Sequence, residues 1–169
     1  LDVATARILE LYDAPRAPAD VTAAMAFLLQ RMTELFRTEL PVMPGALELV
    51  DAVRAHGLLT ALVSSSYRVL VDAALETLGA ERFDVTVAGD ELEHGKPHPD
   101  AYLTACRRLG VEPAQTVALE DAMSGILSAE AAGCQVIAVP WLAPIDPAPG
   151  RLVVSSLLDV DAAALAASR

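Results

Sequence analysis

The sequence is poor in cysteine, in aromatic residues and in positive charge, and each shortage excludes a class of protein. Its two cysteines, Cys106 and Cys134, have no C-x-x-C spacing, so we expect buried free thiols in a reducing cytosol instead of a disulfide framework. The three histidines, His56, His94 and His98, show no zinc-ligand spacing with a third ligand, and His98 is expected to be a turn residue. No zinc site is therefore predicted.

Long apolar runs are also absent, which argues against a membrane-spanning protein. No stretch approaches the length of a spanning helix, and the first residues show no basic segment followed by an apolar one. We therefore expect a soluble, cytoplasmic protein without a membrane partner, either a monomer or a weak homodimer.

The small number of positive charges leaves the chain strongly acidic. Lysine and arginine together number 12 against 23 aspartates and glutamates, so the formal net charge is −11 and the isoelectric point is near 4.5. Because nucleic-acid binders carry a basic face, a nucleic-acid partner is not expected. An acidic protein that handles an anionic substrate needs a local cation, and a metal ion would supply one.

Apolar residues are plentiful and make up 54% of the 169 positions. This fraction and length predict one folded domain with at most a small appendage. Apolar spacings of three and four predict two helices within residues 1–40, the first ended by Pro15 and Pro18 and the second beginning near Asp20 as its N-cap. Residues 40–45 break the pattern and are predicted to be a linker.

Beyond the linker, helices of about three turns alternate with short apolar strands. Glycine follows most of the helices, and the strands are continuous apolar runs typical of a sheet buried on both faces. This alternation predicts an α/β fold, a three-layer Rossmann-like parallel sheet whose ligands bind beyond the carboxyl ends of the strands. The predicted helices are 46–56, 67–78, 100–109, 124–132 and 159–167, and the predicted strands are 58–64, 85–88, 116–119, 136–140 and 152–155.

The first polar group at a strand end is Ser64-Ser65-Ser66, which directly follows residues 58–63. Hydroxyl and backbone N–H groups at such a turn can bind an anion, helped by the dipole of the following helix. The alternative is that one serine caps that helix.

The second group surrounds Lys96 in the segment Gly95-Lys96-Pro97-His98-Pro99-Asp100. The prolines fix the backbone, and a lysine held beside carboxylates can neutralise a phosphoryl group as a compact point charge. The alternative is a solvated surface lysine. Asp100 is expected to cap the helix that begins there.

The third group is the pair Glu120-Asp121 at the end of an apolar run, followed by Gly125. Magnesium binds through one or two carboxylates together with water and phosphate oxygens, and adjacent residues leaving a strand can offer one direct and one indirect ligand. Gly125 would let the backbone pass close to the bound group. The alternative is an acidic helix start, favourable to the helix dipole by less than about 1 kcal/mol.

Taken in order, these motifs resemble those of the haloacid dehalogenase-like hydrolase superfamily. The likeness runs from about residue 42 to residue 140, and the segments 94–100 and 119–125 are specific to it. The sequence looks most similar to the subgroup with an inserted helical cap that includes beta-phosphoglucomutase and many sugar-phosphate phosphatases. On this basis we expect residues 1–41 to be the later part of the cap and residues 42–169 to be the α/β core.

The resemblance also implies roles for the candidate residues. Ser64 and Ser65 would bind the transferred phosphoryl group, Lys96 would bridge it to the nucleophile, and Glu120 and Asp121 would hold Mg²⁺. The implied activity is a Mg²⁺-dependent phosphatase or phosphomutase that acts on a small phosphorylated metabolite, such as a sugar phosphate, through an aspartyl-phosphate.

One part of the family pattern is absent. The family's nucleophile is the first aspartate of an Asp-x-Asp-Gly-Thr motif after a first, central strand, and the chain has no such motif. The Asp-x-Asp at Asp159 and Asp161 opens an alanine-rich helix, so a helix cap is expected there. We therefore expect the first strand and the nucleophile to precede Leu1.

Two other functions stay open at this point. One is a 2-haloacid dehalogenase, which needs no metal, so two clustered acids would have no role in its site. A catalytically inactive binding module would explain the missing nucleophile, but it would not need Ser64, Lys96 and the acidic pair together.

Overall fold

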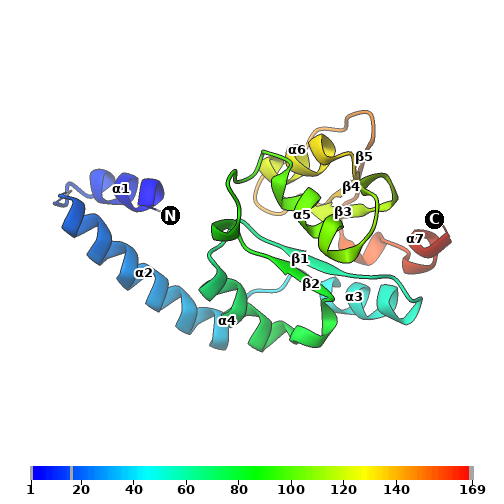
Figure 1. Ribbon diagram of the computed structural model, residues 1–169, viewed down its shortest axis with the longest axis horizontal. Coiled ribbons are helices and arrows are strands. Elements are labelled where there is room, and N and C mark those ends of the chain that lie inside the picture. Colours follow the sequence, from blue (N-terminus) through cyan, green and yellow to red (C-terminus); the bar gives the residue numbers. More distant parts are fainter. Residues whose placement is uncertain (1, 16, 168–169) are drawn as a thin grey trace.

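The computed structural model describes residues 2–15 and 17–167; Leu1, Arg16, Ser168 and Arg169 lie outside the described residues (Figure 1). The helices are α1 (Asp2–Leu11), α2 (Pro18–Thr38), α3 (Ala46–Ala55), α4 (Arg68–Leu78), α5 (Asp100–Leu109), α6 (Met123–Ala132) and α7 (Ala162–Ala167). The strands are β1 (Ala61–Val63), β2 (Val85–Val87), β3 (Val117–Glu120), β4 (Gln135–Ala138) and β5 (Arg151–Val153). Short 3₁₀ turns include η1 (Ala80–Arg82) and η4 (Leu157–Asp159).

The strands form two parallel sheets instead of one. One sheet pairs β1 with β2, and the other has the order β3-β4-β5. Leu62 lies opposite Thr86 in the first sheet, and Leu119 lies opposite Ile137 in the second. Within residues 2–15 and 17–167 no strand lies between β1 and β3, so the predicted α/β fold without its first central strand is confirmed.

Strand β1 is shorter than predicted, since only three residues of the expected run 58–64 are in the strand. The register explains this, because the first sheet is only as long as its β2 partner, Val85–Val87. The carbonyl of Val87 still accepts a hydrogen bond from Ser64 N, which extends the pairing by one bond.

Helices cover the sheets on both sides, which gives the expected layers. Helix α5 packs against β1, β2 and α6, and α6 packs against β3 and β4 (Figure 1). Helix α3 packs against α7 and η4, away from α5. The main buried cluster lies between α5, α6, β3 and β4 and includes Ala101, Tyr102, Cys106, Ala118, Ile126, Ala129, Val136 and Ala138.

The two cysteines lie within this buried cluster and are free thiols, as expected. Burial, and then the neighbouring Cys106, raise the pKa of the Cys134 thiol to about 12. Cys134 therefore stays a protonated, weakly reactive thiol at neutral pH. Among the described residues, no helix combines the length and the apolar composition needed to cross a membrane.

Helices α1 and α2 extend away from the sheets (Figure 1). The last turns of α2 lie along α4, where Arg37 makes two 2.9 Å hydrogen bonds to Glu76 and Thr77 Oγ1 donates to the Phe36 carbonyl. No residue of α2 is fully buried, and Phe27 is 67% exposed. The division into a cap at 1–41 and a core at 42–169 stays a prediction.

The structure corrects two of the predicted helix starts. Helix α2 begins at Pro18, and Asp20 lies inside its first turn, where its carboxylate accepts a hydrogen bond from Ala17 N at 3.0 Å. Helix α5 is preceded by Pro99, and the Asp100 side chain makes no capping bond because its carboxylate faces two imidazoles. By contrast, Asp161 caps α7 as predicted and accepts a hydrogen bond from Ala163 N at 2.8 Å.

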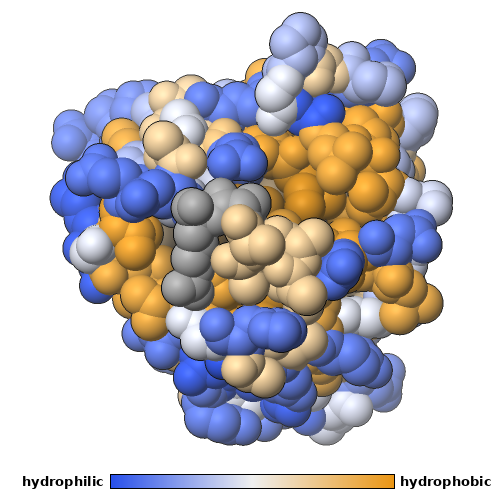
Figure 2. Space-filling view, turned by 90° about the vertical axis from the view of Figure 1, so that its right-hand side faces the viewer, coloured by the Kyte–Doolittle hydropathy of each residue, from blue (hydrophilic) through white to orange (hydrophobic). Residues whose placement is uncertain are grey.

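Figure 2 shows the end of the molecule that carries α7, where apolar side chains occupy much of the visible surface. Exposed apolar residues in the C-terminal third of the chain include Leu142, Leu152 and Leu158.

Candidate active site

The polar groups predicted to act together lie at one edge of the two sheets. Ser64 directly follows β1, Lys96 lies in the loop between β2 and α5, and Glu120 is the last residue of β3. All three, with Asp121, line a cavity of about 1010 Å³. A second cavity of about 110 Å³ is lined by Ser64, Ser65 and Lys96. The structure therefore brings the sequence-predicted site residues together.

The Lys96 side chain connects the two sheets at this edge. Its Nζ lies 2.5 Å from Glu120 Oε1 at the end of β3, and it donates to the Val63 carbonyl of β1 at 3.2 Å. The Lys96 and Glu120 side chains are only 8% and 9% exposed. The surface-lysine alternative is therefore wrong, because Lys96 is buried and paired.

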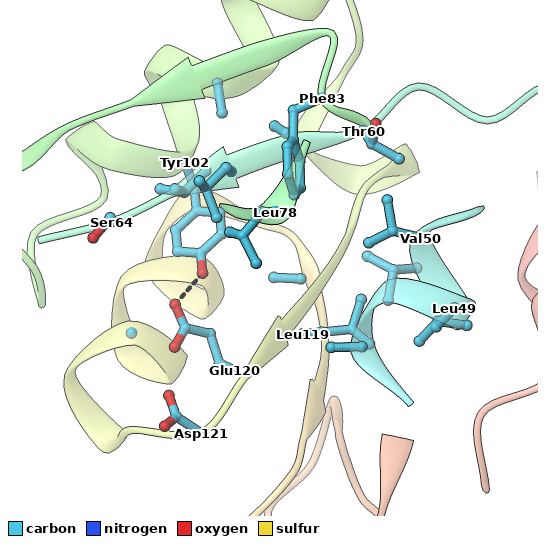
Figure 3. Close-up of a pocket in the computed structure, with 18 of the residues that line it drawn as sticks. Leu49, Val50, Thr60, Ser64, Leu78, Phe83, Tyr102, Leu119, Glu120 and Asp121 are labelled. Atoms are coloured by element: carbon cyan, nitrogen blue, oxygen red, sulfur yellow. Dashed lines mark hydrogen bonds between the residues drawn. The ribbon is translucent and has the colours of Figure 1, made fainter. Parts of the chain in front are cut away.

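Tyr102 is a third member of this group, and the sequence analysis missed it. Its hydroxyl donates to the same oxygen of Glu120, from the first turn of α5 (Figure 3). Lys96 Nζ lies 5.0 Å from the centre of the phenol ring, within reach of a cation–π contact. Burial, and then the Glu120 carboxylate, raise the pKa of the Tyr102 phenol far above its usual range, so the hydroxyl remains a donor. The sequence feature that could have pointed to Tyr102 was its position two residues after Asp100.

Two glycines allow the loops of the site to approach each other. A Cβ at Gly125 would overlap the Glu120 carboxylate, so α6 can pass behind this side chain only with glycine there. A Cβ at Gly89 would overlap the Ser65 carbonyl, and Gly89 N donates to the Ser66 carbonyl at 2.8 Å. Gly125 thus lies against the Glu120 carboxylate, and the expected approach of its backbone to a bound group stays a prediction.

The two adjacent acids have different environments. Glu120 is held by Lys96 and Tyr102, whereas Asp121 is exposed and its carboxylate accepts no hydrogen bond from the described residues. Helix α6 begins at Met123 after Ala122, and its first turn contains no acidic residue. Both acids therefore precede the helix, and the helix-start alternative stays open for Asp121, which stands directly before the N-cap. The free oxygens of Asp121, next to the oriented Glu120, are hard ligands of the kind Mg²⁺ takes.

The serine segment does not cap the next helix. Helix α4 begins at Arg68 with Tyr67 before it, and Ser64 Oγ instead accepts a hydrogen bond from Ser66 N at 3.0 Å. The capping alternative is therefore wrong. Ser64 and Ser65 remain at the carboxyl end of β1, beside Lys96 in the smaller cavity.

The large cavity lies between the facing edges of the two sheets. Its wall includes residues 58–66 around β1 and residues 115–122 around β3, with apolar side chains of α3 and α4 such as Val50 and Leu78 (Figure 3). The facing edges of β1 and β3 make no strand pairing with each other. A strand edge without a partner exposes backbone N–H and C=O groups, so this cavity has the chemistry of a strand-binding slot.

Three further side chains meet at the surface of the same loop. His94 Nδ1 and His98 Nδ1 lie 3.1 and 3.0 Å from the two carboxylate oxygens of Asp100. The spacing rule applied to the sequence excluded a histidine cluster with a third ligand, and the structure contradicts that exclusion.

Comparison with known proteins gives the family of the chain. A family model described as haloacid dehalogenase-like hydrolase matches residues 5–133. The chain belongs to this family. Hexitol phosphatase A of Escherichia coli is 36% identical over 132 residues, which cover 78% of the chain and 60% of that protein.

Solved structures of the family show the same architecture. CbbY of Rhodobacter sphaeroides, in complex with xylulose-(1,5)bisphosphate, is 30% identical with a TM-score of 0.75, over 86% of the chain and 68% of that protein. Beta-phosphoglucomutase of Clostridium difficile, at 21% identity, shares the fold with a TM-score of 0.73 over 95% of the chain and 72% of that protein. The chain spans about half the length of the curated relatives it matches.

Proposed function

We propose that the protein is a Mg²⁺-dependent phosphoryl-transfer hydrolase, a phosphatase or phosphomutase, that acts on a small phosphorylated metabolite. The observation that carries the proposal is the buried Lys96–Glu120 pair beside Ser64 and Asp121, at the carboxyl ends of two parallel strands. Phosphoryl transfer needs positioned charge more than it needs covalent chemistry from the protein. This site offers one fixed cation, two carboxylates and hydroxyl donors.

The nucleophile in this proposal is an aspartate that precedes Leu1 and forms an aspartyl-phosphate. The slot between β1 and β3 supports this assignment, because a strand bound there in parallel would end beside Lys96 and Glu120. In the complete site Lys96 would contact both the nucleophile and the transferred phosphoryl group.

The remaining roles follow from the environment of each side chain. Ser64 and Ser65 would donate hydrogen bonds to phosphoryl oxygens, since both line the small cavity beside Lys96. Asp121 would be the direct ligand of Mg²⁺ because its carboxylate is free, and Glu120 would support the site while it neutralises Lys96. The bound ion would neutralise negative charge on the phosphoryl group.

A sugar phosphate is the proposed substrate class. The names of hexitol phosphatase A and of the xylulose bisphosphate complex of CbbY favour a phosphorylated polyol or sugar. The two buried free thiols agree with a cytoplasmic location. A metal-free dehalogenase would have no use for the unpaired Asp121 carboxylate.

The proposal is tested by Asp121→Asn in the complete protein, with thermal melts and phosphatase assays with and without Mg²⁺. Metal that binds only the folded state stabilises it by RT ln(1 + [Mg²⁺]/Kd), about 2.7 kcal/mol at a hundredfold excess over Kd. We expect the wild type to melt at a higher temperature with Mg²⁺. Asp121→Asn should lose both this rise and the activity, yet be as stable as the wild type, or slightly more so, without metal, because a like-charge contact is lost.

The exposed Asp72 provides a matched control, because its carboxylate lies on α4 outside the site. Asp72→Asn should keep both activity and the response to Mg²⁺. A wild-type melting temperature that is indifferent to millimolar Mg²⁺, together with an active Asp121→Asn enzyme, would exclude the proposed metal site.

A further inference from the structure

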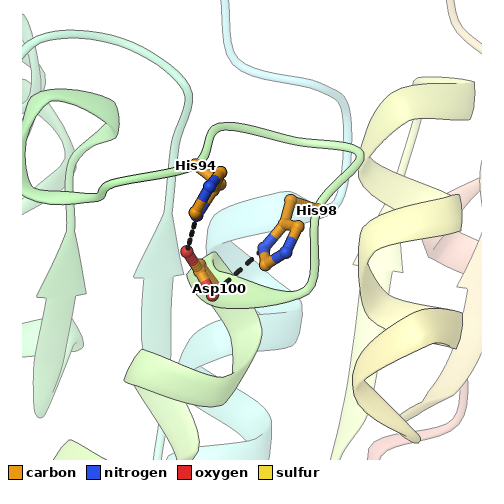
Figure 4. A group of neighbouring side chains, drawn as sticks. All are labelled: His94, His98 and Asp100. Atoms are coloured by element: carbon orange, nitrogen blue, oxygen red, sulfur yellow. Dashed lines mark hydrogen bonds and ion pairs between the residues drawn. The ribbon is translucent and has the colours of Figure 1, made fainter.

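His94, His98 and Asp100 form a compact cluster outside the proposed phosphoryl-transfer site. The two imidazoles are stacked, with ring centres 4.4 Å apart and an angle of 30° between their planes (Figure 4). Each turns its Nδ1 toward a different oxygen of the same carboxylate, at 3.1 Å for His94 and 3.0 Å for His98. The potential ligand atoms of the three residues all lie within 4.8 Å of one another.

These separations are close to those of a metal coordination shell. Tetrahedral Zn²⁺ holds nitrogen and oxygen ligands at about 2.0–2.1 Å, which places neighbouring ligand atoms about 3.3 Å apart. The two imidazole–carboxylate separations already have nearly this length. A cation bound among these atoms would replace the two Nδ1 protons once both imidazoles turn toward one common point.

The backbone that carries the cluster is held in place. His98 lies between Pro97 and Pro99, and its N–H donates to the Gly95 carbonyl at 3.1 Å. Its carbonyl accepts a 2.6 Å hydrogen bond from Ser128 Oγ, which is fully buried in α6. Asp100 is fixed as the first residue of α5. A site whose ligands are held in position loses less conformational entropy on binding.

The charges near the cluster also favour a cation. Lys96 lies between the two histidines in sequence, but its ammonium points inward to Glu120 and Val63 and does not compete with a cation at the cluster. The imidazole rings are about half exposed, with side-chain exposures of 54% for His94 and 46% for His98, so a metal can reach them from solvent. The chain as a whole carries a formal charge of −11.

We propose that His94, His98 and Asp100 form a binding site for a borderline transition-metal ion such as Zn²⁺ or Co²⁺, with solvent completing the coordination. Two imidazoles and one carboxylate suit Zn²⁺, Co²⁺ and Ni²⁺, whereas Mg²⁺ takes oxygen ligands. The site is separate from the proposed Mg²⁺ site, since among the described residues no hydrogen bond or ion pair joins its ligands to Glu120 or Asp121. Because Lys96 lies between the two histidines, a bound ion would hold the loop that positions its ammonium.

The test is titration of the complete, metal-free protein with Co²⁺, followed by visible absorption and by calorimetry. We expect one equivalent to bind with imidazole coordination and to raise the melting temperature. His94→Gln and His98→Gln keep a hydrogen-bond donor near Asp100 but remove the imidazole ligand. Each substitution should lower the affinity for this equivalent of Co²⁺ by more than the roughly 10–100-fold that loss of an outer-shell partner costs. Melts without metal establish that these variants fold.

Two controls separate this site from others. His56→Gln removes the third histidine, which is exposed at the end of α3, and Asp121→Asn removes the proposed Mg²⁺ ligand. Both variants should still bind one equivalent of Co²⁺. The proposal is overturned if the wild type binds no Co²⁺ equivalent, if both Gln variants bind it as tightly as the wild type, or if Asp121→Asn abolishes it.

Discussion

The ammonium of Lys96 lies 2.5 Å from the Glu120 carboxylate, and both side chains are more than nine-tenths buried. Removing one partner from a buried ion pair leaves the other charge unpaired, at a cost of about 3–5 kcal/mol. Tyr102 reduces the same penalty because it donates to the same carboxylate. The pair therefore links the stability of the protein to the chemistry of its site.

Lys96→Ala in the complete protein should lower kcat by at least about a hundredfold, because it removes a preorganised positive charge from the transition state. Lys96→Arg should not fully restore the rate, since a planar guanidinium cannot replace a compact ammonium in a tight site. Arg107→Ala removes an equal charge from the exposed side of α5 and should leave kcat unchanged. Steady-state kinetics with a sugar phosphate would measure all three, and a near-normal rate in Lys96→Ala would contradict the assigned role.

Gly125→Ala should destabilise the protein by about 1–3 kcal/mol, because the new Cβ would overlap the Glu120 carboxylate. The sign of the stability change is informative, since replacing glycine by alanine inside a helix ordinarily stabilises the helix by about 0.5–1 kcal/mol. Gly95→Ala is the matched control, because a Cβ at that position meets nothing within 4 Å. Urea unfolding measures both changes, and a stabilised Gly125→Ala protein would mean that Glu120 moves freely.

Asp84 should make the stability depend on pH. Its carboxylate accepts hydrogen bonds from Thr60 N at 2.8 Å and from Arg54 at 2.7 Å. The backbone bond from Thr60 is the main cause that lowers the pKa of Asp84; burial opposes it and Arg54 assists it. Because the folded-state pKa lies below the ordinary value of 3.8, the contribution is complete above that pH and is lost as the pH falls through the folded-state pKa.

Asp84→Asn should therefore destabilise the protein at about pH 7, and the difference from the wild type should shrink as the pH falls below the ordinary pKa. Unfolding free energies at several pH values would show this convergence. Asp72→Asn, at a side chain that is 59% exposed, should change the stability little. A difference for Asp84→Asn that is constant with pH would argue against an ionised Asp84 as its source.

The chain of 169 residues, expressed alone, should lack Mg²⁺-dependent phosphatase activity and fold poorly. Within residues 2–15 and 17–167 the facing edges of β1 and β3 have no strand partner, and the cavity of about 1010 Å³ between them is lined largely by apolar side chains. Exposed apolar surface of this kind binds dyes such as ANS. Clear Mg²⁺-dependent hydrolysis of p-nitrophenyl phosphate by this chain would contradict the mechanism proposed above.

The fold could be predicted because its signals are local. Apolar runs alternate with amphipathic helices, so a parallel α/β fold follows from periodicity alone. The carboxyl ends of parallel strands meet at one edge, so Ser64, Lys96 and Glu120 could be grouped before any distance was known. Their partners could not be predicted, because the Lys96–Glu120 bond spans 24 residues and depends on how the chain returns to the sheet.

The errors arose where one side chain had two possible partners. Asp100 stands at the start of α5, which favours a cap, yet its carboxylate is taken by His94 and His98. Which contact forms depends on the turn around Pro97 and Pro99, a feature that residue type alone does not determine. Tyr102 was missed for a different reason, because a tyrosine on an apolar helix face is ordinarily a core residue.

Helix α5 has a consequence for local unfolding. Within the described residues, no backbone ladder bond joins the two sheets, and α5 contacts β1 and β2 while its Tyr102 reaches Glu120 on β3. As long as no strand occupies the slot between β1 and β3, the β1–β2 half and the β3–β4–β5 half can therefore open without breaking each other's ladder bonds. Amide hydrogen exchange of the 169-residue chain should then show two protection levels, one for each half, and α5 should exchange with the β3–β4–β5 half because Tyr102 and Cys106 belong to the core cluster there.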